Sequence, residues 1–148
     1  MKKLLITLIM AVSALLMFNS CSKKGCTDPD SKNYDPNAIE DDGSCEYEGQ
    51  AIFWYDNTTK MKLLNAGIIN INYFIDGYKV GSKSVTAYSA TEPNCGQGGL
   101  VTATQNMGNS KTLTIKYEVY EAENPSNLLF TGNINFKANS CVKVRLIK

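Results

Sequence analysis

The stretch between Cys26 and Cys45 constrains the fold most, because it is too polar and too short to enclose a hydrophobic core. Its two prolines, its glycine and its Asp and Asn residues favour turns, since these residues fix φ or accept hydrogen bonds from their own backbone. Such a segment keeps one shape only when a cross-link holds it, and a cysteine stands at each end. A disulfide that closes a loop of this size contributes about 3 kcal/mol through loop entropy. We therefore expect a disulfide-closed, irregular acidic module over residues 26–48.

Acidic side chains crowd this module, in which Lys32 is the single basic residue. Carboxylates packed this densely repel one another unless they face water or share a cation. Clusters of carboxylate, amide and carbonyl oxygens suit Ca²⁺, which accepts irregular coordination, although Lys32 stands where a third EF-hand ligand would be. Two interpretations stay open: a calcium site, or a turn whose Asp and Asn side chains cap backbone N–H groups. The candidate calcium ligands are Asp28, Asp30, Asn33, Asp35, Asp41 and Asp42.

Residues 26–45 read Cys-Thr-Asp-Pro-x-x-x-Asn-Tyr-Asp-Pro-x-Ala-x-x-Asp-Asp-Gly-Ser-Cys. This pattern resembles a short module of surface and secreted proteins of the Bacteroidota, loosely grouped with thrombospondin type 3-like calcium-binding segments. Ser31 stands where that module often has Ala. The resemblance implies a cell-envelope lipoprotein and favours calcium binding, but it covers only this part of a 148-residue chain.

A basic start and an apolar run open the chain: Met1-Lys2-Lys3 precedes Leu4 to Phe18, which is almost wholly apolar. A membrane-spanning helix needs about 20 apolar residues, so the run is typical of a signal-peptide helix. Because Cys21 directly follows a small residue, we expect a lipoprotein signal peptide over residues 1–20 and a lipid anchor on Cys21. The alternative is an ordinary secretory signal that leaves Cys21 without lipid.

Residues 21–25 would then be the lipidated cysteine and a short tether. The predicted location is the outer membrane of the cell envelope, with the membrane as a partner through the lipid. Surface lipoproteins of the Bacteroidota often carry an acidic tether, and Lys23-Lys24 is basic. A periplasm-facing position is therefore favoured over the cell surface.

The chain has five cysteines, an odd number that needs an explanation in an exported protein. A lipid on Cys21 leaves four, which allow three pairings. One pairing, Cys26–Cys45 with Cys95–Cys141, keeps each bridge within its own unit. Disulfides imply an oxidising compartment. A thiol metal site is not expected, because the chain has neither Cys-x-x-Cys nor histidine.

Residues 49–148 have the size of one domain and alternate apolar with polar residues, as strands with one buried face do. Asp76-Gly77 between two such runs predicts a hairpin. We expect an all-β fold, an antiparallel β-sandwich of about seven strands that is immunoglobulin-like or transthyretin-like, with one helical turn near residues 59–64. The second disulfide would tie the loop after Asn94 to the start of the last strand. The predicted strands are 51–55, 69–73, 78–84, 100–104, 113–119, 128–136 and 142–146.

Catalysis is not expected. Histidine, the usual base for a nucleophile, is absent, and the carboxylates of this domain fall at turn or solvent-facing positions. Lysines are scattered, whereas nucleic-acid binding needs a basic patch, so no nucleic-acid partner is predicted. Aromatic side chains stack on apolar faces while their polar tips stay wet, which makes Trp54 and Tyr120 candidate ligand-binding residues. Alternation favours a buried Trp54 and an exposed Tyr120.

The sequence thus predicts a non-enzymatic, lipid-anchored envelope protein. Its acidic stalk would bind calcium, and its β-sandwich would serve adhesion or assembly with a protein or glycan ligand. One alternative is a carbohydrate-binding accessory module of a glycan-utilisation system. Another is a purely structural envelope subunit that joins its neighbours through an uncovered sheet edge.

Overall fold

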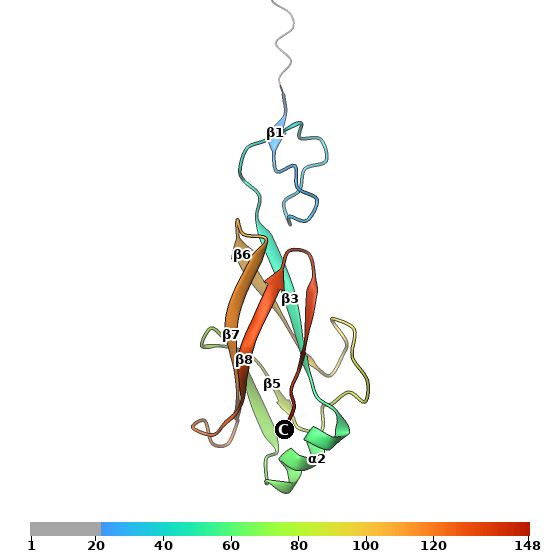
Figure 1. Ribbon diagram of the computed structural model, residues 1–148, viewed down its shortest axis with the longest axis vertical. Helices are drawn as coiled ribbons and strands as arrows, with labels where there is room; N and C mark the ends of the chain where they lie inside the picture. Colours follow the sequence, from blue (N-terminus) through green and yellow to red (C-terminus); the bar gives the residue numbers. More distant parts are fainter. Residues whose placement is uncertain (1–21) are drawn as a thin grey trace, which may run out of the picture.

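The computed structural model describes residues 22–148, so the predicted signal peptide over residues 1–20 and the predicted lipid on Cys21 lie outside the described residues. The molecule is elongated, with the acidic module at one end and helix α2 beside the C-terminus at the other (Figure 1). The elements are β1 (Lys24–Gly25), β2 (Glu40–Asp41), β3 (Tyr47–Trp54), α2 (Asn57–Asn65), β4 (Asn70–Ile75), β5 (Tyr78–Ser84), β6 (Val101–Gly108), β7 (Thr112–Glu121), β8 (Leu128–Lys137) and β9 (Cys141–Arg145).

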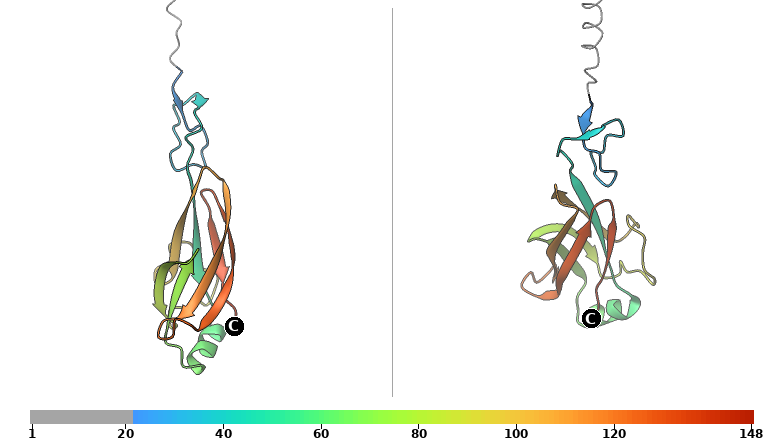
Figure 2. Two further views of the ribbon diagram at one scale, coloured as in Figure 1. Left: turned by 90° about the vertical axis from the view of Figure 1, so that its left-hand side faces the viewer. Right: turned by 45° about the horizontal axis from the view of Figure 1, so that its top comes forward.

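Strands β3 to β9 form two sheets, one in the order β6-β3-β9 and the other in the order β5-β4-β7-β8. Their long axes run from the module toward α2 (Figure 2). The predicted all-β sandwich is confirmed, with one difference: β9 pairs with β3 in parallel. No hairpin joins these two strands, so no short connection forces them to run antiparallel.

The core lies between the two sheets, where every second residue of the strands points inward. Phe53 of β3 contacts two rings of the facing sheet, with ring centroids 5.2 Å from Tyr73 and 5.5 Å from Tyr117. Burial alternates along β4, where Ile71, Tyr73 and Ile75 are buried and the residues between them are half-buried. This is the period-two pattern by which the sequence predicted the strands.

The hairpin at Asp76-Gly77 is confirmed. Both residues have positive φ, 51° and 76°, as a two-residue turn between twisted strands requires. Glycine adopts that conformation without strain, and Asp tolerates it better than most residues.

Helix α2 is longer than the single turn expected near residues 59–64. Asp56 caps it, because its side chain accepts a hydrogen bond of 2.9 Å from the backbone N–H of Thr59. Thr59 and Leu63 are its buried residues, so it has no apolar stripe for the sequence to reveal. Among the described residues, no helix is long and apolar enough to cross a membrane.

Candidate functional site

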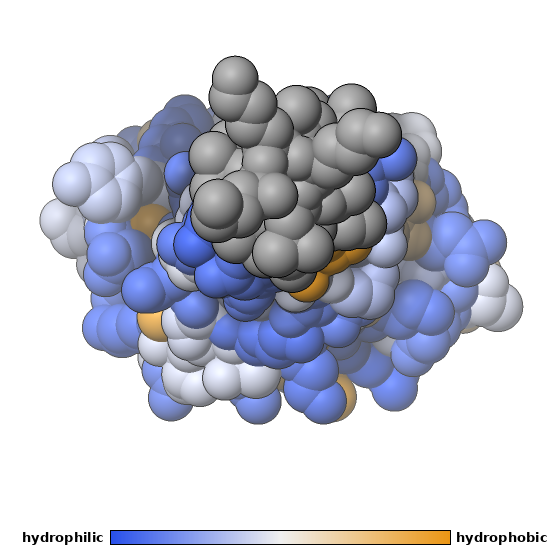
Figure 3. All heavy atoms as spheres, turned by 90° about the horizontal axis from the view of Figure 1, so that it is seen from above, coloured by the Kyte–Doolittle hydropathy of each residue, from blue (hydrophilic) through white to orange (hydrophobic). Residues whose placement is uncertain are grey.

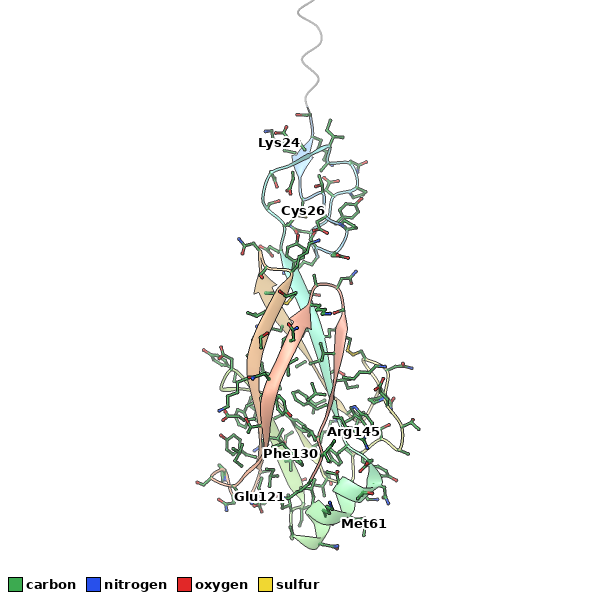
Figure 4. The ribbon with its side chains drawn as sticks, in the orientation of Figure 1. Lys24, Cys26, Met61, Glu121, Phe130 and Arg145 are labelled. Carbon is green, nitrogen blue, oxygen red and sulfur yellow. A yellow bond between two sulfur atoms is a disulfide. The ribbon has the colours of Figure 1, made fainter. Side chains whose placement is uncertain are left out.

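The acidic module is a series of turns closed by a disulfide, as predicted. Cys26 and Cys45 are bonded, with an S–S distance of 1.98 Å and a Cα–Cα distance of 4.8 Å. The parallel pairing of β1 with β2 adds a short ladder at the end farthest from the sandwich. Figure 4 shows Lys24 and Cys26 in this module, at the end of the molecule opposite Met61 and Arg145.

Four of the predicted calcium ligands cap the backbone two residues ahead of them. In each case Oδ1 accepts a hydrogen bond from an N–H group, and the four together form a series of Asx turns. Their side-chain oxygens therefore define the path of the loop. The pairs are Asp28 with Asp30 (3.0 Å), Asp35 with Asn37 (2.9 Å), Asp41 with Gly43 (3.0 Å) and Asp42 with Ser44 (3.0 Å).

Asn33 joins two parts of the module. Its Nδ2 donates to the carbonyl of Ser44 over 2.7 Å, and its Oδ1 accepts from the N–H of Glu46 over 2.8 Å. The side chain thus holds the loop against the segment that leads into β3.

Carboxylate oxygens of three module residues face lysines. Oδ2 of Asp28 lies 2.5 Å from Nζ of Lys111, which is also 3.7 Å from Oδ2 of Asp30. Oδ2 of Asp35 lies 2.7 Å from Nζ of Lys23. Asp28 and Asp30 therefore share a cation that the protein itself supplies.

The six predicted ligands do not converge on one point. In the part of the chain that the structure describes, no group of three or more His, Cys, Asp or Glu side chains is placed to hold a metal ion. As they stand, these side chains do not fit a calcium centre, because their oxygens are divided among backbone N–H groups and separate lysines. Calcium binding stays a prediction that requires these contacts to rearrange.

The module is locked onto the sandwich at Asp28. The hydroxyl of Tyr47 donates to Oδ2 of Asp28 over 2.7 Å. Nζ of Lys111 forms an ion pair with the same oxygen and lies 5.7 Å from the centroid of the Tyr47 ring. The contact with Lys111 and the hydrogen bond from Tyr47 lower the pKa of Asp28 from 3.8 to about 2. We call these three residues the clamp.

No pattern in the sequence predicted the clamp. Tyr47 fell within the module predicted for residues 26–48, whereas it is the first residue of β3, which crosses the predicted boundary. Lys111 was one of several scattered strand lysines. Its pairing with Asp28 joins residues far apart in the chain, so no local pattern could reveal it.

Trp54 is buried but does not belong to the central core. Its side chain is 6% exposed, and Ile52 on the same face of β3 is fully buried. Both point away from the facing sheet, opposite to Phe53. Trp54 Nε1 has no hydrogen-bond partner. The predicted burial of Trp54 is confirmed, so its indole cannot reach a ligand in this conformation.

Residues 86–100, here called the covering loop, lie over this outer face of β6-β3-β9. Several contacts tie the loop to its neighbours, and the predicted bridge from the loop to the first residue of β9 is among them. The loop thus lies on the same face of the sheet as Trp54, and the Arg145 guanidinium stacks on the indole with its Cζ 5.2 Å from the ring centroid. The contacts include the Cys95–Cys141 disulfide, the ion pair of Glu92 with Lys143 (2.8 Å), the hydrogen bond from the Gly96 N–H to Oγ1 of Thr102 (3.3 Å) and the one from the Ser89 N–H to the carbonyl of Tyr55 (3.1 Å).

Tyr120 lies on the outer face of the four-stranded sheet and is half-buried, less exposed than predicted. Its ring packs edge-to-face against Phe74 of β4, with centroids 5.6 Å apart and planes at 89°. The alternation of side chains along the strand predicted that Tyr120 points outward. Its neighbour Phe74 was not predicted to lie on this face, because the predicted strand ended at Tyr73.

A small pocket of about 250 Å³ lies where β3 leaves the module, between the start of that strand and the β8–β9 turn. The hydroxyl of Ser140, in its wall, donates to the carbonyl of Lys137 over 2.9 Å, so this possible nucleophile is not held by a base. Glu48 is the one ionisable side chain in the wall. The lining residues are Glu48, Gly49, Gln50, Asn139, Ser140 and Cys141.

No family model matches the chain, and no solved structure matches it. A stretch of 24 residues, 16% of the chain, is 71% identical to part of the chloroplastic ribulose bisphosphate carboxylase/oxygenase activase of Spinacia oleracea. The match covers 5% of the activase. It shows a shared short segment and carries neither the fold nor the activity of the activase to this chain.

Proposed function

We propose that the protein is a non-enzymatic, lipid-anchored envelope protein in which the acidic module is a stiff stalk and the β-sandwich serves adhesion or assembly. The observation that supports the stalk is the clamp. Tyr47 donates to Asp28 while it begins β3, so the strand that enters the sandwich also binds the module. Cys45, two residues earlier, closes the module, and no flexible linker separates the two parts.

Two turns of the sandwich reach this junction and support the same proposal. The N–H of Asn139, in the β8–β9 turn, donates to the carbonyl of Glu48 over 2.9 Å. Lys111, the clamp residue that reaches Asp28, belongs to the β6–β7 turn. Seen from the module end, the visible surface is mostly hydrophilic (Figure 3).

The two tether lysines are paired with acids of the module. Lys23 binds Asp35 over 2.7 Å, and Lys24 binds Glu40 over 2.8 Å. The segment therefore presents less free positive charge than its sequence indicates. The tether itself still lacks the acidic residues that surface lipoproteins of the Bacteroidota often carry, and on that ground we propose an outer-membrane lipoprotein in a periplasm-facing position; the protease experiment below tests this position.

The anchor is tested by expressing the whole chain and its Cys21→Ser variant in a lipoprotein-processing bacterium fed an alkyne fatty acid. Label on the unaltered chain in the membrane fraction, and its loss from the variant, would support the anchor. Equal labelling, or equal membrane retention without label, would overturn it. Protease treatment of intact cells separates the two positions, because a periplasm-facing domain stays protected.

The stalk is tested separately by ¹⁵N relaxation of residues 22–148. One rotational correlation time for module and sandwich is expected for the unaltered chain. Independent tumbling of the module is expected after Tyr47→Phe combined with Lys111→Met. Independent tumbling of the unaltered chain would refute the stiff stalk.

Calcium belongs to the proposal as an ion that would stiffen the stalk further. A calorimetric titration compares the unaltered residues 22–148 with a variant in which Asp28, Asp41 and Asp42 are changed to Asn. Binding that the variant loses would support a metal-stiffened stalk. If neither chain responds at millimolar calcium, the module is a spacer held by its disulfide and its clamp.

The second candidate function is carbohydrate binding. The observation that favours it is the aromatic pair of Phe74 and Tyr120 on the outer face of the four-stranded sheet. Trp54 does not take part in this proposal, because it is buried.

A further inference from the structure

The face of β5-β4-β7-β8 that points away from the core is rich in uncharged polar side chains. We call it the outer face. Strand register places these side chains in rows across the sheet, since the directly paired residues of neighbouring strands lie on the same side. Its members include Ser82 and Ser84 of β5, Asn70, Asn72 and Phe74 of β4, Lys116, Glu118 and Tyr120 of β7, and Thr131, Asn133 and Asn135 of β8.

The aromatic pair lies on the two middle strands of this face. Tyr120 is paired in register with Asn72, and Phe74 with Glu118, so the two rings are diagonal neighbours. Edge-to-face packing over 5.6 Å holds Tyr120 in one orientation. A ring fixed in this way loses little conformational entropy when a ligand stacks on it.

Two of the three charges beside the pair cancel, whereas Lys79 of β5, which is paired in register with Phe74, has no ion-pair partner among the described residues. Nζ of Lys116 donates to Oε1 of Glu118 over 2.6 Å, and this contact lowers the pKa of Glu118. Burial, followed by the influence of Glu118, raises the pKa of Tyr120, so its hydroxyl keeps its proton. The two middle strands therefore present amides, hydroxyls and two rings without a free charge, and Lys79 on the edge strand is a single positive charge beside them.

One acceptor next to Tyr120 lacks a donor. Oδ1 of Asn72 is buried and has no hydrogen-bond partner, a condition that lowers stability. A ligand with several hydroxyls that lies across Asn72 and Tyr120 could donate a hydrogen bond to Oδ1 of Asn72. A small movement of the neighbouring side chains would expose this oxygen to the ligand. Asn133 and Thr131 are exposed on the next strand and offer further hydrogen bonds.

We propose that the outer face binds a neutral oligosaccharide, with a sugar ring against Tyr120 and Phe74 and its hydroxyls on Asn72, Thr131 and Asn133. The inference rests on the second of the functions proposed above and names its site and ligand class. Aromatic faces, uncharged hydrogen-bonding groups and cancelled charges are the chemistry that a neutral polyol requires.

The experiment titrates ¹⁵N-labelled residues 22–148 with cellohexaose, xylohexaose, maltoheptaose and mannohexaose, and with a heparin hexasaccharide as the charged comparison. We expect at least one neutral sugar to shift the resonances of the outer face and of no other surface. Tyr120→Ala should weaken that binding about tenfold, the loss of one stacking contact. Asn133→Ala, at an exposed position that does not threaten folding, should weaken it about threefold.

Tyr78→Ala is the matched control, because Tyr78 is 76% exposed at the β4–β5 hairpin tip, away from the outer face. It should bind within a factor of two of the unaltered chain. The proposal is overturned if no neutral sugar shifts the outer face, if the heparin fragment binds more tightly there, or if Tyr120→Ala and Tyr78→Ala behave alike. None of these results affects the Cys21 labelling or the relaxation measurement, so the anchor and the stalk are judged independently.

Discussion

Removing the Cys95–Cys141 disulfide should release the covering loop and expose Trp54. The bridge joins residues 46 apart in the sequence, and the loop-entropy relation gives it about 4 kcal/mol of stability. The remaining ties are weaker. The Glu92–Lys143 pair is exposed to water, where ion pairs contribute little. Pro93 is the fully buried apolar side chain of the loop, and the ring of Tyr88 packs against Lys60 of α2 over 4.2 Å.

The perturbation is Cys95→Ala combined with Cys141→Ala, and Trp54 supplies the assay because it is the only tryptophan in the chain. We expect the urea-unfolding free energy to fall by about 4 kcal/mol. Under native conditions we expect the Trp54 emission to shift to longer wavelength and acrylamide to quench it about twice as strongly, because the loop opens locally without global unfolding.

The matched control is Cys26→Ala combined with Cys45→Ala. It removes a bridge of sequence separation 19, which should cost about 3 kcal/mol of module stability and leave the quenching of Trp54 unchanged. If Trp54 stays equally protected in the Cys95/Cys141 variant and the unfolding free energy changes by less than about 1 kcal/mol, the loop is held by packing, and the reasoning from the bridge fails.

Two further predictions follow from single residues. The carboxyl of Asp28 should titrate near pH 2 in ¹³C NMR spectra, and Lys111→Met should move its midpoint toward 3.8. Because folding lowers this pKa, the contribution of the clamp to the free energy of unfolding is complete above pH 3.8 and disappears as the pH falls toward 2. An unchanged titration midpoint of Asp28 in the Lys111→Met variant would contradict the assignment. Gly81→Ala would place Cβ 2.9 Å from both methyl groups of Val101, so we expect a loss of about 1–3 kcal/mol in urea unfolding. Gly98→Ala, which meets no atom within 4 Å, should change stability little, and equal effects of the two would refute the packing argument.

Local patterns predicted much of the fold. Alternation along 113–119 and 142–146 placed β7 and β9 within a few residues of their observed bounds, and Asp76-Gly77 identified its hairpin. These signals suffice because strand burial has a period of two and a two-residue turn needs positive φ. The pairing of the cysteines followed from the division of the chain into two units.

Such local patterns could not predict contacts between residues far apart in the chain. Because neighbouring residues of a strand point to opposite faces, the sequence predicted that Trp54 and Phe53 face opposite ways. Only the fold shows that the covering loop lies on the face of the sheet that carries Trp54. Nothing in the sequence around Lys111 predicted its contact with Asp28. Phe74 was not placed because Tyr73, Phe74 and Ile75 are three apolar residues in succession, so the apolar–polar alternation of the sequence ends at Tyr73 although the burial of β4 alternates on to Ile75.

The parallel pairing of β3 with β9 has a mechanical consequence. The chain enters β3 at the module end and leaves β9 near α2, and five register pairs join the two strands, from Gln50–Cys141 to Trp54–Arg145. Tension between the two ends of the molecule would pull these strands in opposite directions along their length. The hydrogen bonds of the ladder would then share the load and break together, whereas a pull on the β4–β5 hairpin would open its bonds one after another. The protein should therefore resist force along its long axis far better than force applied at its side.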